Sequence, residues 1–135
     1  MRFGQTGKVV DDFYVTGLRW SPVYLLAGSR PALFEAGFAC AAKLYESDIR
    51  SVLGARTPEI LFLTHVHYDH CGATPYFKRV FPGITVAASK HSAEILARPN
   101  AQRLIESLSR HAISLVAEAD GVDKERLIDE PFTPF

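Results

Sequence analysis

The sequence has few cysteines, no excess of charge of one sign and no long apolar run. Its two cysteines, Cys40 and Cys71, form no C-x-x-C pair, so at most one disulfide is available, and a cytosolic chain would keep both thiols reduced. The 15 basic side chains equal the 15 acidic ones, which argues against a nucleic-acid-binding protein with its usual basic excess. No apolar run approaches the ~18 residues of a membrane-spanning helix. We therefore expect neither a nucleic-acid nor a membrane partner.

The remaining composition is that of an ordinary globular chain. Of the 135 residues, 47% are apolar and 22% are charged. These values fit a single domain over residues 1–135 that buries roughly two-thirds of the surface its unfolded chain exposes. The sequence contains no internal repeat, low-complexity segment or linker. Residues 1–5 do not begin a signal peptide, so we expect a cytoplasmic protein.

The apolar pattern changes its period along the chain. Short β-rich runs between glycines and prolines indicate adjacent antiparallel strands over residues 8–15, 23–27 and 32–34. Later segments alternate between helix and strand, with helices over residues 41–53, 74–80, 89–97 and 100–119 and strands over 60–63 and 84–87. The unbroken apolar run of residues 60–63 predicts a strand buried on both faces, and Thr74 is placed as a helix N-cap. This order is typical of an α/β architecture.

Three of the five histidines lie close together, directly after the most apolar run, in the segment Thr64-His65-Val66-His67-Tyr68-Asp69-His70-Cys71-Gly72. In an extended segment, residues i and i+2 point to the same side, so His65 and His67 can present their imidazoles to one point. Asp69 and His70 follow in the turn toward the next helix. Imidazole with carboxylate suits Zn²⁺ or Fe²⁺ better than Mg²⁺ or Ca²⁺. The cluster therefore favours a metal site over a solvated polar loop.

The same segment resembles the T-H-x-H-x-D-H-x-G signature of the metallo-β-lactamase superfamily, which follows a buried strand in that family. Upstream, residues 23–27 and 32–34 are similar to the family's paired strands, which end in a D-[TA]-G turn. This sequence has Glu35-Ala36-Gly37 at that turn. Glutamate is one methylene longer, and the sequence leaves open whether it takes the role of the family's aspartate beside the metal ligands. The resemblance covers most of residues 8–90.

The resemblance implies a role for each polar residue of the motif. His65 and His67 would belong to a first metal position, and Asp69 and His70 to a second. The implied cofactor is zinc, as one or two ions, with iron as the alternative. Asp69 would also be the catalytic residue that orients the nucleophile or acts as its base.

Two neighbours of these ligands each have two interpretations. Cys71 is either a further metal ligand or redox-sensitive group, or a small side chain that packs where the loop enters the helix. Tyr68 either hydrogen-bonds a substrate or packs outward. In both cases packing is the simpler interpretation, and the sequence alone does not decide.

The family completes both metal positions with later ligands that this sequence lacks. His91 and His111 are the remaining histidines, and neither lies in the G-H-[ST]-x-G-[HS] pattern of the next ligand, so we expect both to face solvent. The resemblance therefore implies an incomplete α/β domain, the N-terminal half of an αβ/βα sandwich, with a mixed β-sheet, flanking helices and a C-terminal helical segment. A missing C-terminal half or a homo-oligomer would cover its exposed apolar surface.

Three functions stay open at this point. The first is a metal-dependent hydrolase, in which metal-activated water attacks an ester, thioester, lactone or amide of a small-molecule substrate. The later helices are similar to the helical insertion of the glyoxalase II-like branch and favour that chemistry. The second is a mononuclear iron oxidoreductase similar to a persulfide dioxygenase, or a phosphodiesterase, on the same fold. The third is a catalytically incomplete half-domain that acts as an interaction piece.

Overall fold

The computed structural model of the chain describes residues 6–135, so residues 1–5, where we expect no signal peptide, lie outside the described part. Within it, six strands form one mixed sheet in the spatial order of the sequence. Each neighbouring pair from β1 to β4 is antiparallel, whereas β4, β5 and β6 are parallel. The strands are β1 (Gly7–Val10), β2 (Phe13–Leu18), β3 (Ser21–Leu26), β4 (Ala32–Phe34), β5 (Ile60–Phe62) and β6 (Thr85–Ala87).

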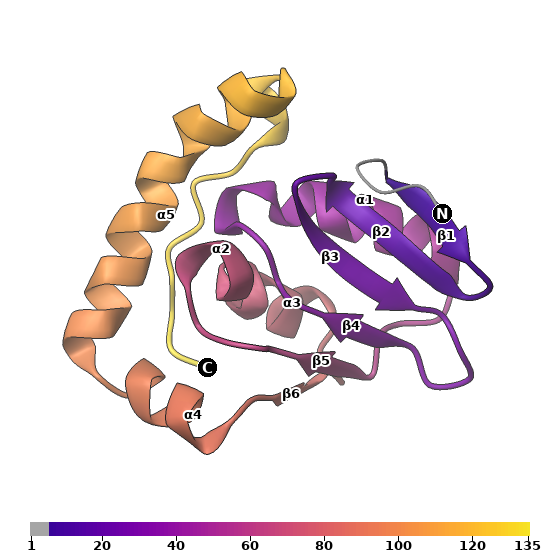
Figure 1. Cartoon of the computed structure of the whole chain (residues 1–135), viewed down its shortest axis with the longest axis horizontal. Coiled ribbons are helices and arrows are strands. Elements are labelled where there is room, and N and C mark those ends of the chain that lie inside the picture. The colour runs from indigo at the N-terminus through magenta and orange to yellow at the C-terminus, as the bar shows by residue number, and fades with distance from the viewer. Residues whose placement is uncertain (1–5) are drawn as a thin grey trace.

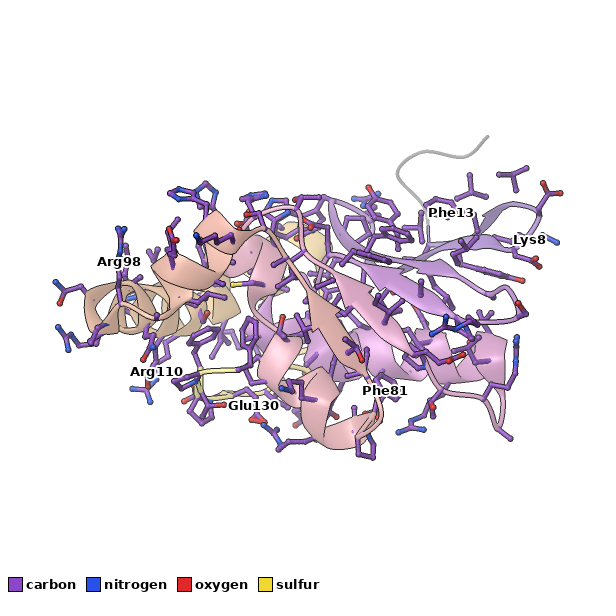
Figure 2. The ribbon with its side chains drawn as sticks, turned by 90° about the horizontal axis from the view of Figure 1, so that it is seen from below. Lys8, Phe13, Phe81, Arg98, Arg110 and Glu130 are labelled. Carbon is purple, nitrogen blue, oxygen red and sulfur yellow. The ribbon has the colours of Figure 1, made fainter. Side chains whose placement is uncertain are left out.

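Helices cover one face of this sheet and lie at one of its ends. The helices are α1 (Ala42–Leu53), α2 (Tyr68–Cys71), α3 (Thr74–Val80), α4 (Lys90–Leu96) and α5 (Pro99–Asp120), with 3₁₀ turns η1 (Ala39–Ala41) and η2 (Lys124–Arg126). Figure 1 shows α5 at the end of the molecule opposite β1, with the C-terminal segment running beside it. In Figure 2 the helices lie mainly on one side of the sheet, with Phe81 on that side and Phe13 on the other. The mixed α/β architecture predicted from the sequence is therefore correct.

The core lies between the sheet and helices α1 and α3. Leu25, Leu33 and Leu61 project from three adjacent strands and are fully buried. Tyr45 of α1 is fully buried among them, and its hydroxyl donates to the backbone oxygen of Ser21 at 2.7 Å. Burial of this aromatic and aliphatic surface is the main source of stability for this half of the molecule.

The other face of the sheet carries aromatic side chains that no helix covers within the described residues. Tyr24, Phe34 and Phe62 are register partners on β3, β4 and β5, and the rings of Phe34 and Phe62 stack at 5.3 Å. Phe62 is 40% exposed. The prediction that residues 60–63 form a strand buried on both faces is therefore wrong, because only the helix-covered face has a packing partner here.

Several element boundaries differ from the sequence prediction. Residues 8–15 form parts of two strands, because the chain turns at Asp11, whose φ of 45° is left-handed. Thr74 is the first residue of α3 and not its N-cap, which is Ala73. The other predicted helices agree with the structure to within a residue or so, including α1, which ends before Gly54.

Helix α5 is only half covered, and the chain after it packs beneath it. Ile105, Ala112 and Val116 are buried, whereas Leu104 and Leu115 remain exposed. The segment after α5 is held by buried side chains of Leu127 and Phe132 and by a backbone hydrogen bond from Ile128 to Cys40 at 3.0 Å. The segment after α5, which contains Pro131 and Pro134, thus packs against the core next to this helix.

No helix within residues 6–135 combines the length and the apolarity needed to cross a bilayer, and this includes the longest one, α5, with 22 residues.

Candidate metal centre

The candidate centre lies where the two parallel strands β4 and β5 end at the same edge of the sheet, a common location for sites in α/β folds. The chain leaves β5, passes through an extended loop and enters α2 at its N-cap, His67. The end of β4 supports α2, because the amide of Ala36 donates to the oxygen of His70 at 2.7 Å and Gly72 donates to Gly37 at 2.9 Å. Backbone hydrogen bonds therefore hold the loop after β4 against the histidine loop.

Three imidazole rings converge at this edge. The ring centroids of His65 and His67 are 4.7 Å apart, and those of His65 and His70 are 4.1 Å apart. Asp69 comes next to them, with its Oδ2 3.7 Å from Nε2 of His70. The structure thus brings together all four residues that the sequence analysis selected, and their roles as metal ligands stay a prediction.

Glu35 joins this cluster from the end of β4. Its side chain is buried, with the residue only 8% exposed, and both carboxylate oxygens are engaged. Oε1 accepts a hydrogen bond from the backbone N–H of Thr64 at 2.8 Å, and Oε2 contacts Nδ1 of His70. The contact at Nδ1 leaves Nε2 of His70 to face the rest of the cluster. The longer glutamate therefore reaches the histidine loop, a point that the sequence left open.

Glu35 also has an unusual backbone. Its φ of 69° lies in the left-handed region, which is rare for a residue other than glycine. Such strain costs about 1–3 kcal/mol and persists where the surroundings hold the residue in place, often at functional sites. Here the Glu35 amide donates to Phe62 at 2.9 Å, so three hydrogen-bonded contacts fix this residue.

The environment keeps His65 in the form that binds metals. Burial lowers the pKa of His65 below its ordinary value, and the neighbouring His70 imidazole lowers it further, while Glu35 acts in the opposite direction. A neutral imidazole offers a lone pair at neutral pH, as metal coordination requires. In addition, Thr64 Oγ1 lies 2.8 Å from Nδ1 of His65 and orients the ring.

The two side chains with open interpretations now have definite surroundings. Cys71 is fully buried, and burial raises the pKa of its thiol to about 12, so the thiol is protonated at neutral pH and packs in the core. Tyr68 is partly buried, with its ring 5.8 Å from that of Phe38. His91 and His111 are exposed on α4 and α5, as expected.

The donor atoms fit a metal ion by their chemistry and spacing. One ligand atom from each of Glu35, His65 and His70 can be chosen so that all lie within 4.8 Å of one another. Imidazole nitrogen and carboxylate oxygen are the donors that zinc and iron accept in proteins. Glu35, His65 and His70 therefore form a candidate metal-binding group, with His67 and Asp69 beside it.

Solved structures share this fold. They include a subclass B3 metallo-β-lactamase from a soil metagenome (25% identity, TM-score 0.60), one from Bradyrhizobium japonicum (22%, 0.59) and a β-lactamase from Chitinophaga pinensis (23%, 0.57). The matches cover 70%, 67% and 69% of this chain but only 38%, 34% and 36% of those proteins. The fold is therefore one half of a metallo-β-lactamase fold, and the chain spans much less than the full length of these proteins.

A family model described as the metallo-β-lactamase superfamily matches residues 17–133. The chain belongs to the metallo-β-lactamase superfamily. The match extends beyond the first 90 residues and includes α4 and α5, so the helical segment is part of the same family unit.

Proposed function

We propose that this chain carries half of the active site of a metal-dependent hydrolase that acts on an ester, thioester, lactone or amide of a small molecule. The observation that supports it most is the convergence of Glu35, His65 and His70 within 4.8 Å at the end of two parallel strands. Zinc or iron bound there would supply Lewis acidity and a water activated at neutral pH. The glyoxalase II-like branch remains a proposal that rests on the helices after β6.

Each residue of the cluster has a distinct part in this proposal. His65, His67, Asp69 and His70 would hold the metal. Glu35, whose Oε2 contacts Nδ1 of His70, would orient that ring and leave its Nε2 available as a ligand, and would not itself need to bind the ion. Asp69 is the catalytic residue, whose partly exposed carboxylate orients the attacking water or takes its proton. The row of Tyr24, Phe34 and Phe62 on the face of the sheet that no helix covers would pack against a C-terminal half or another copy of the chain.

Metal content and hydrolysis test this proposal together. The 135-residue chain is purified without added metal, analysed for zinc and iron, and assayed against small esters, thioesters, lactones and amides. We expect near-stoichiometric metal, and hydrolysis where a second copy of the chain supplies the missing ligands. Both should be lost in His67→Ala, whereas His91→Ala, which changes an exposed histidine of α4, should behave as the wild type.

Each other outcome would change the conclusion. Hydrolysis that survives in His67→Ala would reject the metal-dependent mechanism. A chain of confirmed mass that binds no metal would favour a half-domain that acts as an interaction piece. Iron in place of zinc would direct the assays toward oxidation of a persulfide. A cytoplasmic location stays a prediction, with which the two free, buried cysteines are compatible.

A further inference from the structure

A cavity of about 510 Å³ opens beside the candidate metal centre, between α2 and the helices α4 and α5. Its wall includes His67 and Asp69 on one side and Ile95, Leu104 and Leu108 on the other. Small-molecule sites of this size are mostly apolar with a few polar groups that fix the reacting part of the ligand. The cavity has that composition. Its polar side chains are those of His67 and Asp69, which belong to the metal cluster, and that of Tyr68 between them.

The apolar wall is accessible. Leu104 is 59% exposed and Leu108 is also exposed, although both belong to the apolar stripe of α5 that would normally be buried. Ile105, which also lines the cavity, is buried and holds this part of α5 against the core. Leu104 and Leu108 are therefore exposed on a helix that is packed against the core, next to His67 and Asp69.

The side chains that line the cavity offer no cationic partner to an anion. None of its lining residues, all of them in the described part of the chain, is a lysine or an arginine. Asp69 is the acidic residue among them. In the metal-free chain, a carboxylate placed there would lose its hydration without a cationic partner and would be repelled by Asp69. An uncharged apolar group has no comparable hydration to lose, and it covers the exposed leucines when it enters.

We propose that this cavity binds the uncharged, apolar arm of the substrate, an aliphatic chain or ring attached to the bond that is hydrolysed. The proposal rests on the proposed function, because it names the class of substrate for the same centre. An arm seated between Leu104 and Ile95 would direct the adjoining carbonyl toward His67 and Asp69, which form the opposite wall. A protein segment seated there would instead block the centre.

Binding of uncharged amides to the metal-free chain tests this inference. The 135-residue chain is stripped of metal with a chelator and titrated with butyramide, hexanamide and octanamide by calorimetry. We expect affinity to rise with chain length, by up to about fourfold per methylene. Octanoate, which differs from octanamide by its charge, should bind at least tenfold more weakly.

Two leucine variants locate the binding. Leu104→Ser should weaken octanamide binding at least fivefold, because it removes one wall of the cavity. Leu115→Ser is the matched control, since Leu115 is 49% exposed on the same helix and does not line the cavity, and it should bind octanamide as the wild type does. Circular dichroism checks that both variants fold.

Three results would overturn the inference. They are an affinity independent of chain length, an equal effect of the two leucine variants, and sedimentation showing a dimer that Leu104→Ser dissociates, which would make a second copy the occupant. The titration needs no metal. Chain-length-dependent binding by a chain that takes up neither zinc nor iron would therefore reject the hydrolase and keep the cavity. Hydrolysis of esters at a rate independent of the length of their apolar chain would keep the hydrolase and reject the cavity as the site of the apolar arm.

Discussion

At the scale of single residues, the geometry of the candidate centre depends most on Glu35. Its carboxylate joins the backbone of Thr64 to the imidazole of His70, and its backbone is held at a positive φ by contact with β5. Carboxylates that bind the far nitrogen of a ligand histidine fix the ring and raise its basicity, and their loss commonly reduces metal affinity 10–100-fold. A residue outside the motif therefore controls one inside it.

Replacing Glu35 by glutamine should weaken metal binding without unfolding the chain. Glu35→Gln keeps the size of the side chain but removes the negative charge, so we expect zinc affinity to fall about 10–100-fold in competition with a chelator. Glu59→Gln is the control, because Glu59 is an exposed carboxylate that pairs with Arg30 at 3.4 Å away from the cluster. Equal affinity in the two variants would show that Glu35 does not position a ligand.

The two buried thiols make the free energy of unfolding decrease at alkaline pH. Burial raises the pKa of Cys40 to about 11 and that of Cys71 to about 12, from 9.0 in the unfolded chain. Their contribution is complete below about pH 9 and is lost as the pH rises toward 11–12, because only the unfolded chain ionises in that range.

We therefore expect the free energy of unfolding to fall above pH 9, with each thiol contributing roughly 1.4 kcal/mol per pH unit. Urea unfolding at a series of pH values measures this. At pH 8 both thiols should react with a thiol reagent many times more slowly in the folded than in the unfolded protein. Fast labelling of the native chain would contradict the burial of Cys71.

At the scale of elements, the junction between α2 and α3 determines how the metal loop meets the rest of the fold. Gly72 lies at this junction, where a Cβ would be 2.5 Å from the amide nitrogen of Ala39 and 2.6 Å from the oxygen of Tyr68. These are backbone atoms and cannot move away cheaply. The close approach also allows the hydrogen bond from Gly72 to Gly37 at 2.9 Å.

Gly72→Ala should therefore destabilise the protein by about 3 kcal/mol, the upper range for overpacking. Urea denaturation gives the value. Gly83→Ala is a fair comparison, because a Cβ at Gly83 meets nothing within 4 Å, and its effect should stay within about 0.5 kcal/mol. If the two substitutions had the same effect, the contact between the β4 loop and α2 would not limit stability.

At the scale of the whole molecule, the two faces of the sheet are unequal. One face is covered by α1 and α3, and the other presents the row of Tyr24, Phe34 and Phe62, with Phe62 40% exposed. An apolar row of this kind on a sheet normally marks a surface that another part of a protein covers. The solved relatives are between two and three times as long as their matched part, which agrees with such a partner.

The isolated 135-residue chain should therefore associate through this face. We expect sedimentation velocity to show reversible, concentration-dependent association that Phe62→Lys reduces, because a charge on the row must stay hydrated. Leu115→Lys, at a somewhat more exposed position on α5, should not reduce it. A wild-type chain that stays monomeric at all concentrations would contradict the prediction.

The candidate metal ligands of the motif, and most of the helices and strands, are determined by local sequence. His65, His67, Asp69 and His70 are close in the chain, so their meeting requires only an extended loop that enters a helical turn. Helix α1 can be located because its apolar residues recur at helical spacing and Gly54 ends it. These features can be predicted because they depend only on residues that are close together in the chain.

Tertiary structure alone decided the features that join distant segments. Glu35 reaches His70 because β4 and β5 pair in parallel, and only that pairing brings a residue 35 positions away to the same sheet edge. The exposure of Phe62 and the cavity beside Leu104 depend on which elements cover each face. Apolar residues look alike in a sequence whether they are covered or not, since burial is a property of the packed neighbours and not of the side chain itself.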